Sequence, residues 1–260
     1  MELKKITPSA IISFNECPLK YKLAYIDKRP TKESIAFAFG KAAHEAIQNA
    51  FKERNNKLAK EQFLDLFKKF FDEAKNKLSD KEINSYDELV NDGNNIFDRF
   101  HEFVSLDEVE DVECEEKLIE SVNENWTFSG RLDLVFKVKN KWHIVDIKTS
   151  KSGWRLDKLQ NVSIISQPIL YKYFWAKKHN VEQNKILTSF LILKKKVVKK
   201  PIESLKVSSG PITIDKCVSL MNNTIQLIDK GFFFKGFNKN VCKWCEFNNT
   251  NDCVGSKEEY

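Results

Sequence analysis

The sequence lacks three features that would place it in particular classes of protein. No apolar run approaches the roughly 20 residues that cross a bilayer, and the start of the chain has no apolar signal-peptide region. The Gly-x-x-x-x-Gly-Lys-Ser/Thr phosphate loop is absent, which argues against a helicase motor in this chain. Internal repeats and low-complexity blocks are also absent. We therefore expect a cytoplasmic protein that makes no contact with membranes.

The residues that are present are typical of a globular chain. Of the 260 residues, 42% are hydrophobic and 31% are charged, which is enough apolar material for a buried core. Most of the 20 phenylalanines are expected in that core. A net charge of +6 permits nucleic-acid binding without establishing it. Six cysteines in an intracellular protein indicate thiols or metal ligands more than disulfides.

The periodicity of apolar residues separates a helical first part from a strand-rich middle. Thr7 and Pro8 predict a helix start, and Pro18 predicts its end. Further helices are expected over 19–26, 33–54, 60–78, 85–104, 163–179 and 215–230, and strands over 112–122, 126–138, 141–150, 186–193 and just before Gly210. We interpret 1–260 as one domain, with a helical region at 33–104, a sheet core at 112–207 and a cysteine-rich tail at 231–260.

Two carboxylates and a lysine fall on neighbouring predicted strands. Asp146 and Lys148 are two residues apart, so strand periodicity turns them to the same side. Antiparallel pairing through the short turn near Asn140 would bring Asp133 close to them. Two close carboxylates repel unless a cation lies between them, and oxygen ligands suit Mg²⁺ or Mn²⁺. The alternative is a surface ion pair between Asp146 and Lys148 on an edge strand.

Four short motifs occur in an order that resembles the PD-(D/E)XK nucleases. They are FGKAAH at 39–44, GRLDLV at 130–135, DIKT at 146–149 and QPILY at 167–171. The resemblance is greatest to the branch with the RecB and AddB nuclease domains and the CRISPR-associated single-domain nucleases. It implies an α/β, restriction-endonuclease-like fold: a mixed central sheet flanked by helices, with an N-terminal helical insertion and a cysteine-stapled C-terminal tail.

The same resemblance implies roles for individual residues. The implied metal ligands are the side chains of His44, Asp133 and Asp146 and the carbonyl of Ile147. Lys148 is implied as the catalytic lysine, and Gln167 and Tyr171, one helical turn apart, as residues that touch DNA or support the site. Glu116, on the first predicted strand, is included because some related sites carry an extra acidic residue there. For His44 alone, a surface helix position is the competing interpretation.

The cysteines of the tail form a C-x₂-C-x₇-C pattern. Cys242, Cys245 and Cys253 supply three thiolates, and the resemblance nominates Cys17 as the fourth. Four thiolates suit a [4Fe–4S] cluster or structural Zn²⁺. Spacing alone does not choose between them, whereas the resemblance implies the cluster. Cys114 and Cys217 fall in predicted regular structure and are expected to be buried thiols.

We therefore interpret the chain as a metal-dependent DNA nuclease, an exonuclease or DNA-end-processing enzyme acting on single strands or duplex ends. A role in DNA repair or recombination, beside a separate helicase or recombination partner, is compatible with this. The nucleic-acid contacts expected from the sequence are Trp154, Arg155, Lys194, Lys195 and Lys196; for the lysines the alternative is a solvated face. A binding subunit that does not cut, and a nuclease that acts on RNA, remain as rival hypotheses.

Overall fold

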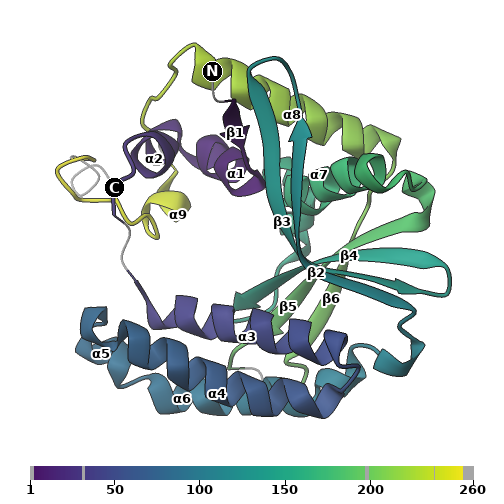
Figure 1. Cartoon of the computed structure of the whole chain (residues 1–260). Coiled ribbons are helices and arrows are strands. Elements are labelled where there is room, and N and C mark those ends of the chain that lie inside the picture. The colour runs from purple at the N-terminus through teal and green to yellow at the C-terminus, as the bar shows by residue number, and fades with distance from the viewer. Residues whose placement is uncertain (1–2, 31–32, 197–198, 237, 254–260) are drawn as a thin grey trace.

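A mixed six-stranded sheet forms the centre of the computed structural model, which describes residues 3–30, 33–196, 199–236 and 238–253 (Figure 1). Its strands are β1 (Lys4–Ile6), β2 (Asp111–Ser121), β3 (Trp126–Val138), β4 (Lys141–Ser150), β5 (Ile186–Lys194) and β6 (Ile202–Val207). The order is β1-β3-β4-β5-β6, and β2 pairs with β3. The β1–β3 and β4–β5 pairs are parallel and the others antiparallel. The predicted mixed sheet flanked by helices is confirmed.

One edge of β3 is shared by two strands. β1 pairs with residues 126–128, and β4 pairs with residues 134–138. Within the described residues, no strand pairs with residues 129–133 on that edge. Figure 1 shows the β2–β3 hairpin rising away from β4 and β5 beyond this point. The sheet therefore forks at Asp133, and β4 continues past the fork with β5 as its partner.

The helices α3 (Ile35–Lys52), α4 (Asn56–Ala74) and α6 (Tyr86–Asp98) cover one face of the sheet (Figure 1). Ser34 and Asn55 accept hydrogen bonds from the first turns of α3 and α4, which fixes where these helices begin. Phenylalanine rings fill this layer, and each fully buried ring contributes about 1.5–3 kcal/mol relative to an exposed one. A Cβ atom at Gly93 would lie 2.0 Å from Cε1 of Phe63, so glycine is what allows α6 to approach α4.

The helices α1 (Pro8–Glu16), α7 (Val162–His179) and α8 (Pro211–Asp229) cover the other face. Short α2 (Pro18–Tyr21) continues into a π-helix, η1 (Lys22–Ile26). The remaining helices are α5 (Asp80–Ile83), α9 (Lys239–Cys242) and the 3₁₀ turns η2 (Lys75–Lys77), η3 (Phe100–Glu102), η4 (Leu106–Glu108), η5 (Leu156–Gln160) and η6 (Gln183–Lys185). Every helix among the described residues is too short or too polar to cross a membrane.

The structure differs from the sequence prediction at several element ends. Strand β1 was not expected, because three residues are too few to show a period. The last long helix begins at Pro211 rather than at 215, since Gly210 occupies the N-cap and proline suits the first turn. The expected helix at 85–104 is α6 followed by the 3₁₀ turn η3. Of the tail at 231–260, residues 237 and 254–260 lie outside the described residues.

Candidate active site

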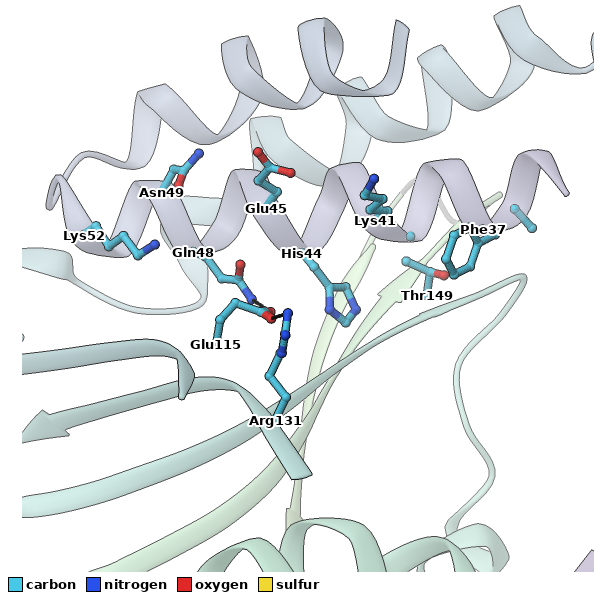
Figure 2. A pocket seen from close by; sticks show the side chains of 12 residues that line it. Phe37, Lys41, His44, Glu45, Gln48, Asn49, Lys52, Glu115, Arg131 and Thr149 are labelled. Atoms are coloured by element: carbon cyan, nitrogen blue, oxygen red, sulfur yellow. Dashed lines mark hydrogen bonds and ion pairs between the residues drawn. The ribbon is translucent and has the colours of Figure 1, made fainter. Parts of the chain in front are cut away.

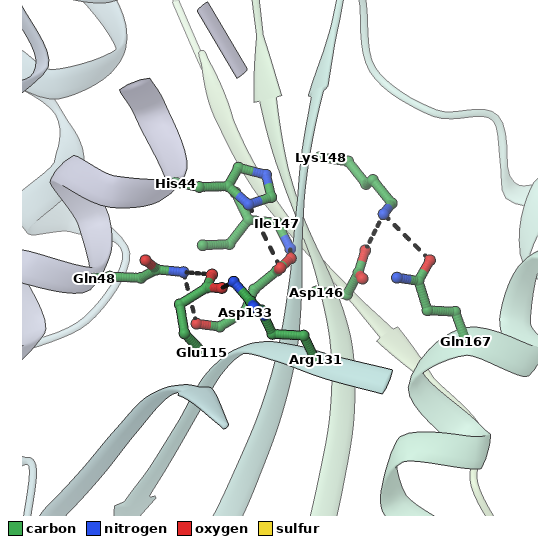
Figure 3. A network of polar contacts seen from close by, with 9 residues as sticks. All are labelled: His44, Gln48, Glu115, Arg131, Asp133, Asp146, Ile147, Lys148 and Gln167. Atoms are coloured by element: carbon green, nitrogen blue, oxygen red, sulfur yellow. Dashed lines mark hydrogen bonds and ion pairs between the residues drawn. The ribbon is translucent and has the colours of Figure 1, made fainter. Parts of the chain in front are cut away.

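Asp133 lies at the fork of the sheet. Its Oδ2 accepts a hydrogen bond of 2.8 Å from the main-chain N–H of Ile147 on β4 (Figure 3). The carboxylate thus takes the place that a carbonyl of β3 would occupy if the two strands continued to pair. This contact brings the two predicted carboxylate strands together and places Ile147 at the site.

Asp146 and Lys148 point from β4 toward α7. The Lys148 ammonium lies 2.8 Å from Oδ2 of Asp146 and donates to Oε1 of Gln167 at 3.2 Å (Figure 3). Asp146 is 1% exposed, yet within the described part of the chain its Oδ1 accepts no hydrogen bond and its Oδ2 is paired with Lys148 alone. Such a buried, under-satisfied carboxylate is costly to the fold and therefore points to function.

The protonation behaviour of this pair follows from burial and charge. Burial raises the pKa of Asp146 to about 6, an effect that the Lys148 ammonium opposes and the Asp133 carboxylate reinforces. Burial alone would lower the pKa of Lys148, but the charge of Asp146 outweighs it and raises that pKa. Lys148 therefore stays cationic beside the two carboxylates.

His44 reaches the same point from helix α3. Its Nδ1 lies 3.5 Å from Oδ1 of Asp133. Burial would lower the pKa of His44, but contact with Asp133 and the nearby charge of Asp146 raise it. The imidazole and two carboxylates from three different elements therefore meet at the fork, as Figure 3 shows.

A second set of polar residues at the site was not anticipated from the sequence. The amide of buried Gln48 donates to Oε1 of Glu115 at 2.6 Å and to the carbonyl of Asp133 at 2.9 Å. Arg131 donates to Oε2 of Glu115 at 3.1 Å. This network holds the main chain of Asp133 from the α3 side. The one available signal was helical spacing, since Gln48 lies one turn after His44.

Glu116 is a correction to the sequence prediction. It faces α7, where it accepts hydrogen bonds from Nε1 of Trp175 at 2.6 Å and from Lys178, and lies 2.7 Å from Nε2 of His179. The acidic residue that β2 brings to the fork is Glu115. Glu115 adopts a left-handed conformation with φ 58, which interrupts the alternation of side chains along β2. A period-two pattern cannot reveal such a residue.

Two cavities flank the fork and have Arg131 as a common lining residue. The first, of about 730 Å³, lies between α3 and the hairpin, and its lining includes His44 and Glu115 (Figure 2). The second, of about 540 Å³, is bordered by Gln167 and Tyr171. A Cβ atom at Gly130 would lie 2.5 Å from Cε1 of Tyr171, so the glycine of the GRLDLV motif makes room for that ring.

The residues at the fork fit a divalent cation. The buried carboxylate of Asp146 has an oxygen, Oδ1, without a hydrogen-bond donor among the described residues, and Asp133 and His44 offer an oxygen and a nitrogen ligand beside it. Hard carboxylate oxygens with an imidazole suit Mg²⁺ or Mn²⁺. A cation there would also relieve the repulsion between the two aspartates.

The residues predicted to contact nucleic acid are already engaged within the protein. The ring of Trp154 packs 4.9 Å from that of Phe190 and lies under the Lys158 ammonium at 4.6 Å. The remaining contacts are Arg155–Asp157 at 3.4 Å, Lys194–Glu203 at 3.5 Å, Lys195 over the ring of Phe39 at 5.4 Å, and Lys196–Glu88. Each of the three lysines thus has a partner within the protein, and only Lys196 is exposed.

The cysteines of the tail lie near α1 and α2. Sγ of Cys17 accepts a hydrogen bond of 3.2 Å from the main-chain N–H of Gly236. Burial raises the pKa of the Cys253 thiol, and the neighbouring Cys17 and Cys242 raise it further. Sγ of Cys242 lies 4.0 Å from the carbonyl oxygen of Gly236, so Cys17 and Cys242 contact the same residue. Of the other two cysteines, Cys217 is buried as expected and Cys114 is half-buried.

Comparisons with known proteins agree with this geometry. A sequence profile of the PD-(D/E)XK nuclease superfamily matches residues 5–250. No curated protein sequence matches the chain. Among solved structures, a candidate exonuclease from Eubacterium rectale has a TM-score of 0.57 at 11% identity, covering 95% of this chain and 89% of that one. The protein SSO0001 has a TM-score of 0.49 at 16% identity, covering 95% and 85%.

Proposed function

The chain belongs to the PD-(D/E)XK nuclease superfamily, and on that premise we propose that it is a metal-dependent DNA nuclease that trims or processes DNA ends. The observation that carries the proposal is the buried Asp146, whose Oδ1 lacks a donor among the described residues while Asp133, His44 and Lys148 surround it. That arrangement suits phosphodiester hydrolysis and has a cost in stability that a purely structural role does not explain.

In this proposal His44, Asp133 and Asp146 hold the cation, with the carbonyl of Ile147 as a further ligand. When bound, Mg²⁺ or Mn²⁺ supplies charge neutralisation at the scissile phosphate and acidifies water. The residues of the chain position the reactants around it.

Lys148 and its neighbours stabilise charge on the substrate and position the metal ligands. Its ammonium, held by Asp146 and Gln167, faces the same space and stabilises negative charge that develops on the phosphate oxygens. Gln167 fixes the direction of that ammonium, and Tyr171 packs one helical turn further along α7. Gln48 and Glu115 hold the main chain of Asp133, so the carboxylate is set in place before substrate arrives.

The proposals of exonuclease activity and of an iron–sulfur cluster rest on resemblance to other nucleases. The motif order is similar to the RecB and AddB branch, and the Eubacterium rectale relative in fold is described as a candidate exonuclease. We therefore propose exonuclease or end-processing activity, beside a separate helicase or recombination partner. For the cysteines we propose that Cys17, Cys242, Cys245 and Cys253 hold a [4Fe–4S] cluster, with structural Zn²⁺ as the alternative.

The experiment is cleavage of end-labelled single-stranded and duplex DNA by anaerobically purified full-length protein, with Mg²⁺, with Mn²⁺ and with EDTA. We expect cutting that EDTA abolishes and a product ladder that reports polarity. A matched RNA substrate separates DNA from RNA as the target. Protein that binds DNA but cuts no nucleic acid with either metal would contradict the proposal and favour a binding subunit.

The visible absorption spectrum of the same preparation tests the cysteine proposal independently. A brown protein whose colour is lost in Cys242→Ser supports the cluster. A colourless protein that contains one equivalent of zinc would overturn it in favour of a structural zinc site.

A further inference from the structure

The wall of the second cavity, which borders Gln167, includes a tyrosine, Tyr25, that the proposed mechanism does not use. The ring of Tyr21 stacks on that of Phe233, with centroids 6.3 Å apart and planes 19° apart. It also stacks on Tyr25, at 5.2 Å and 15°. Tyr21 is 5% exposed, whereas Tyr25 is 40% exposed and lines the cavity. The exposed ring of Tyr25 at the cavity wall is therefore supported from behind by the buried ring of Tyr21.

The backbone presents Tyr25 in an uncommon way. Residues Lys22–Ile26 form a π-helix, a conformation that is rare and frequent at functional sites. A large aromatic ring left exposed in a cavity, with its neighbour already stacked, offers a face for another flat ring. Nucleobases are such rings, and base–aromatic stacking tolerates any base because every base has a π-face.

The walls of the cavity suit the rest of a nucleotide. Lys117 and Arg131 contribute cationic side chains, which neutralise phosphates. Hydroxyl groups come from Thr7, Ser9 and Ser129. The cavity volume of about 540 Å³ lies within the range of small-molecule sites, about 300–1,000 Å³. Aromatic, cationic and hydroxyl groups therefore meet in one space of suitable size.

The cavity is connected directly to the candidate active site. Gln167 lines it and accepts the hydrogen bond from Lys148, which lies 2.8 Å from Asp146. Arg131 lines both this cavity and the one beside His44. A nucleotide on Tyr25 is therefore a neighbour of a phosphodiester bond at the fork.

We propose that this cavity is a subsite for one unpaired nucleotide, whose base stacks on Tyr25 and whose phosphate faces Lys117 and Arg131. The proposal rests on the proposed nuclease function and specifies its substrate as a strand with an unpaired end. A base within a duplex is stacked and paired on both sides, so it reaches Tyr25 only after unpairing, which carries a cost in free energy.

The test measures binding of fluorescent oligonucleotides to full-length protein carrying Asp146→Asn, which prevents cleavage. One probe is a single-stranded oligonucleotide with 2-aminopurine near its end, and the other is a blunt duplex of the same sequence. Addition of Tyr25→Ala should weaken single-strand binding by about 5- to 150-fold and abolish the quenching of 2-aminopurine. Duplex binding should stay within about twofold. Tyr25→Phe, which keeps the ring, should bind as the parent does.

Ile26→Ala is the matched control, since Ile26 is the next residue of the π-helix and is also exposed. It should leave both affinities unchanged. If Tyr25→Ala fails to fold by circular dichroism, Tyr25→Leu, of similar size and without a π-face, takes its place. Unchanged single-strand binding, or equal loss for single strand and duplex, would overturn the subsite.

The outcome is separable from that of the proposed function. Binding that depends on Tyr25, in a protein whose wild type cuts nothing, keeps the subsite and rejects the nuclease. If the wild type cuts DNA and Tyr25→Ala binds single strands as tightly as its parent, the nuclease function is kept and the subsite is rejected.

Discussion

Two clusters of carboxylates with a histidine and a lysine lie on the sheet, and they differ in how their charges are satisfied. At the fork, Asp133 and Asp146 meet His44 and Lys148. The second cluster, on the α7 side of β2, has the same residue types: Glu113, Glu116, Lys178 and His179. Residue type and proximity alone do not distinguish them.

Hydrogen bonding does distinguish them. Glu116 accepts from Trp175 and Lys178, contacts His179 and shares a hydrogen bond with Glu113. Its ligand oxygens are therefore occupied by protein donors. At the fork, Oδ2 of Asp146 is paired with Lys148, but its Oδ1 has no donor among the described residues, and a cavity of about 730 Å³ adjoins its neighbour His44. The hydrogen bonding of Glu116 is that of a structural network. The buried carboxylate of Asp146, with one oxygen unpartnered, is typical of a ligand-binding site.

The largest expected effect is the loss of cleavage in Asp146→Asn. Several kcal/mol of transition-state stabilisation depend on this carboxylate, so the rate should fall by about 10³-fold or more. Affinity for DNA should change little, as measured by fluorescence anisotropy. Glu116→Gln, in the second cluster, is the control and should cut at the wild-type rate. A reversal of these two results would move the active site to the second cluster.

The effect of Mn²⁺ on thermal stability should also distinguish the fork from the second cluster. Mn²⁺ at about 100 times its dissociation constant stabilises a folded protein by about 2.7 kcal/mol, which corresponds to a rise in Tm of roughly 5–10 °C at this chain length. Differential scanning calorimetry should show that rise in the wild type and in Glu116→Gln. It should be absent in Asp146→Asn and in His44→Ala. A rise that disappears only with Glu116→Gln would identify the second cluster as the metal site.

Glu116→Gln should instead destabilise the fold. Gln keeps one acceptor oxygen but replaces the other with an NH₂ donor, so it cannot accept from donors at both positions as Glu116 does. A loss of about 1–3 kcal/mol in the free energy of unfolding is therefore expected in urea. The matched control is Glu120→Gln, whose partner Lys177 lies 3.9 Å away near the surface. That change should cost less than about 1 kcal/mol. Equal effects for both substitutions would contradict a structural role for the second cluster.

The smallest effect concerns the pH dependence of stability. A hydrogen bond to Glu116, together with burial, raises the pKa of Glu113 from its ordinary 4.5 to about 7. The folded state thus binds this proton more tightly than the unfolded state does. The stabilisation is complete below about pH 4.5 and is lost as the pH rises through 7.

Glu113→Gln, whose amide mimics the protonated carboxyl, should remove the loss of stability that the wild type shows as the pH rises through 7. The Tm of the wild type should therefore fall more steeply than that of the variant between pH 5 and pH 8, measured in EDTA. Solvent screening limits the difference to under about 1 kcal/mol. Parallel pH profiles would show that Glu113 is not protonated in the folded protein.

Much of the fold could be predicted from the sequence, because its signals are local. The period-two runs at 126–138 and 141–150 match β3 and β4 to the residue. The i, i+2 spacing of Asp146 and Lys148 placed both on one side of β4, as their 2.8 Å contact shows. Helix ends were less certain, since the start of α8 depends on the cap at Gly210.

The sequence by itself therefore determined the order of the long helices and of strands β2 to β6, and the motifs with Asp133, Asp146 and Lys148 on adjacent strands; the mixed sheet followed from the family resemblance that these motifs carry. Only the tertiary structure decided that the sheet forks at Asp133 and that Gln48 crosses from α3 to hold it. It also decided that Glu115, not Glu116, faces the fork. The physical reason is that periodicity reports neighbours along the chain, whereas a left-handed residue and a split strand edge depend on packing between segments far apart in sequence.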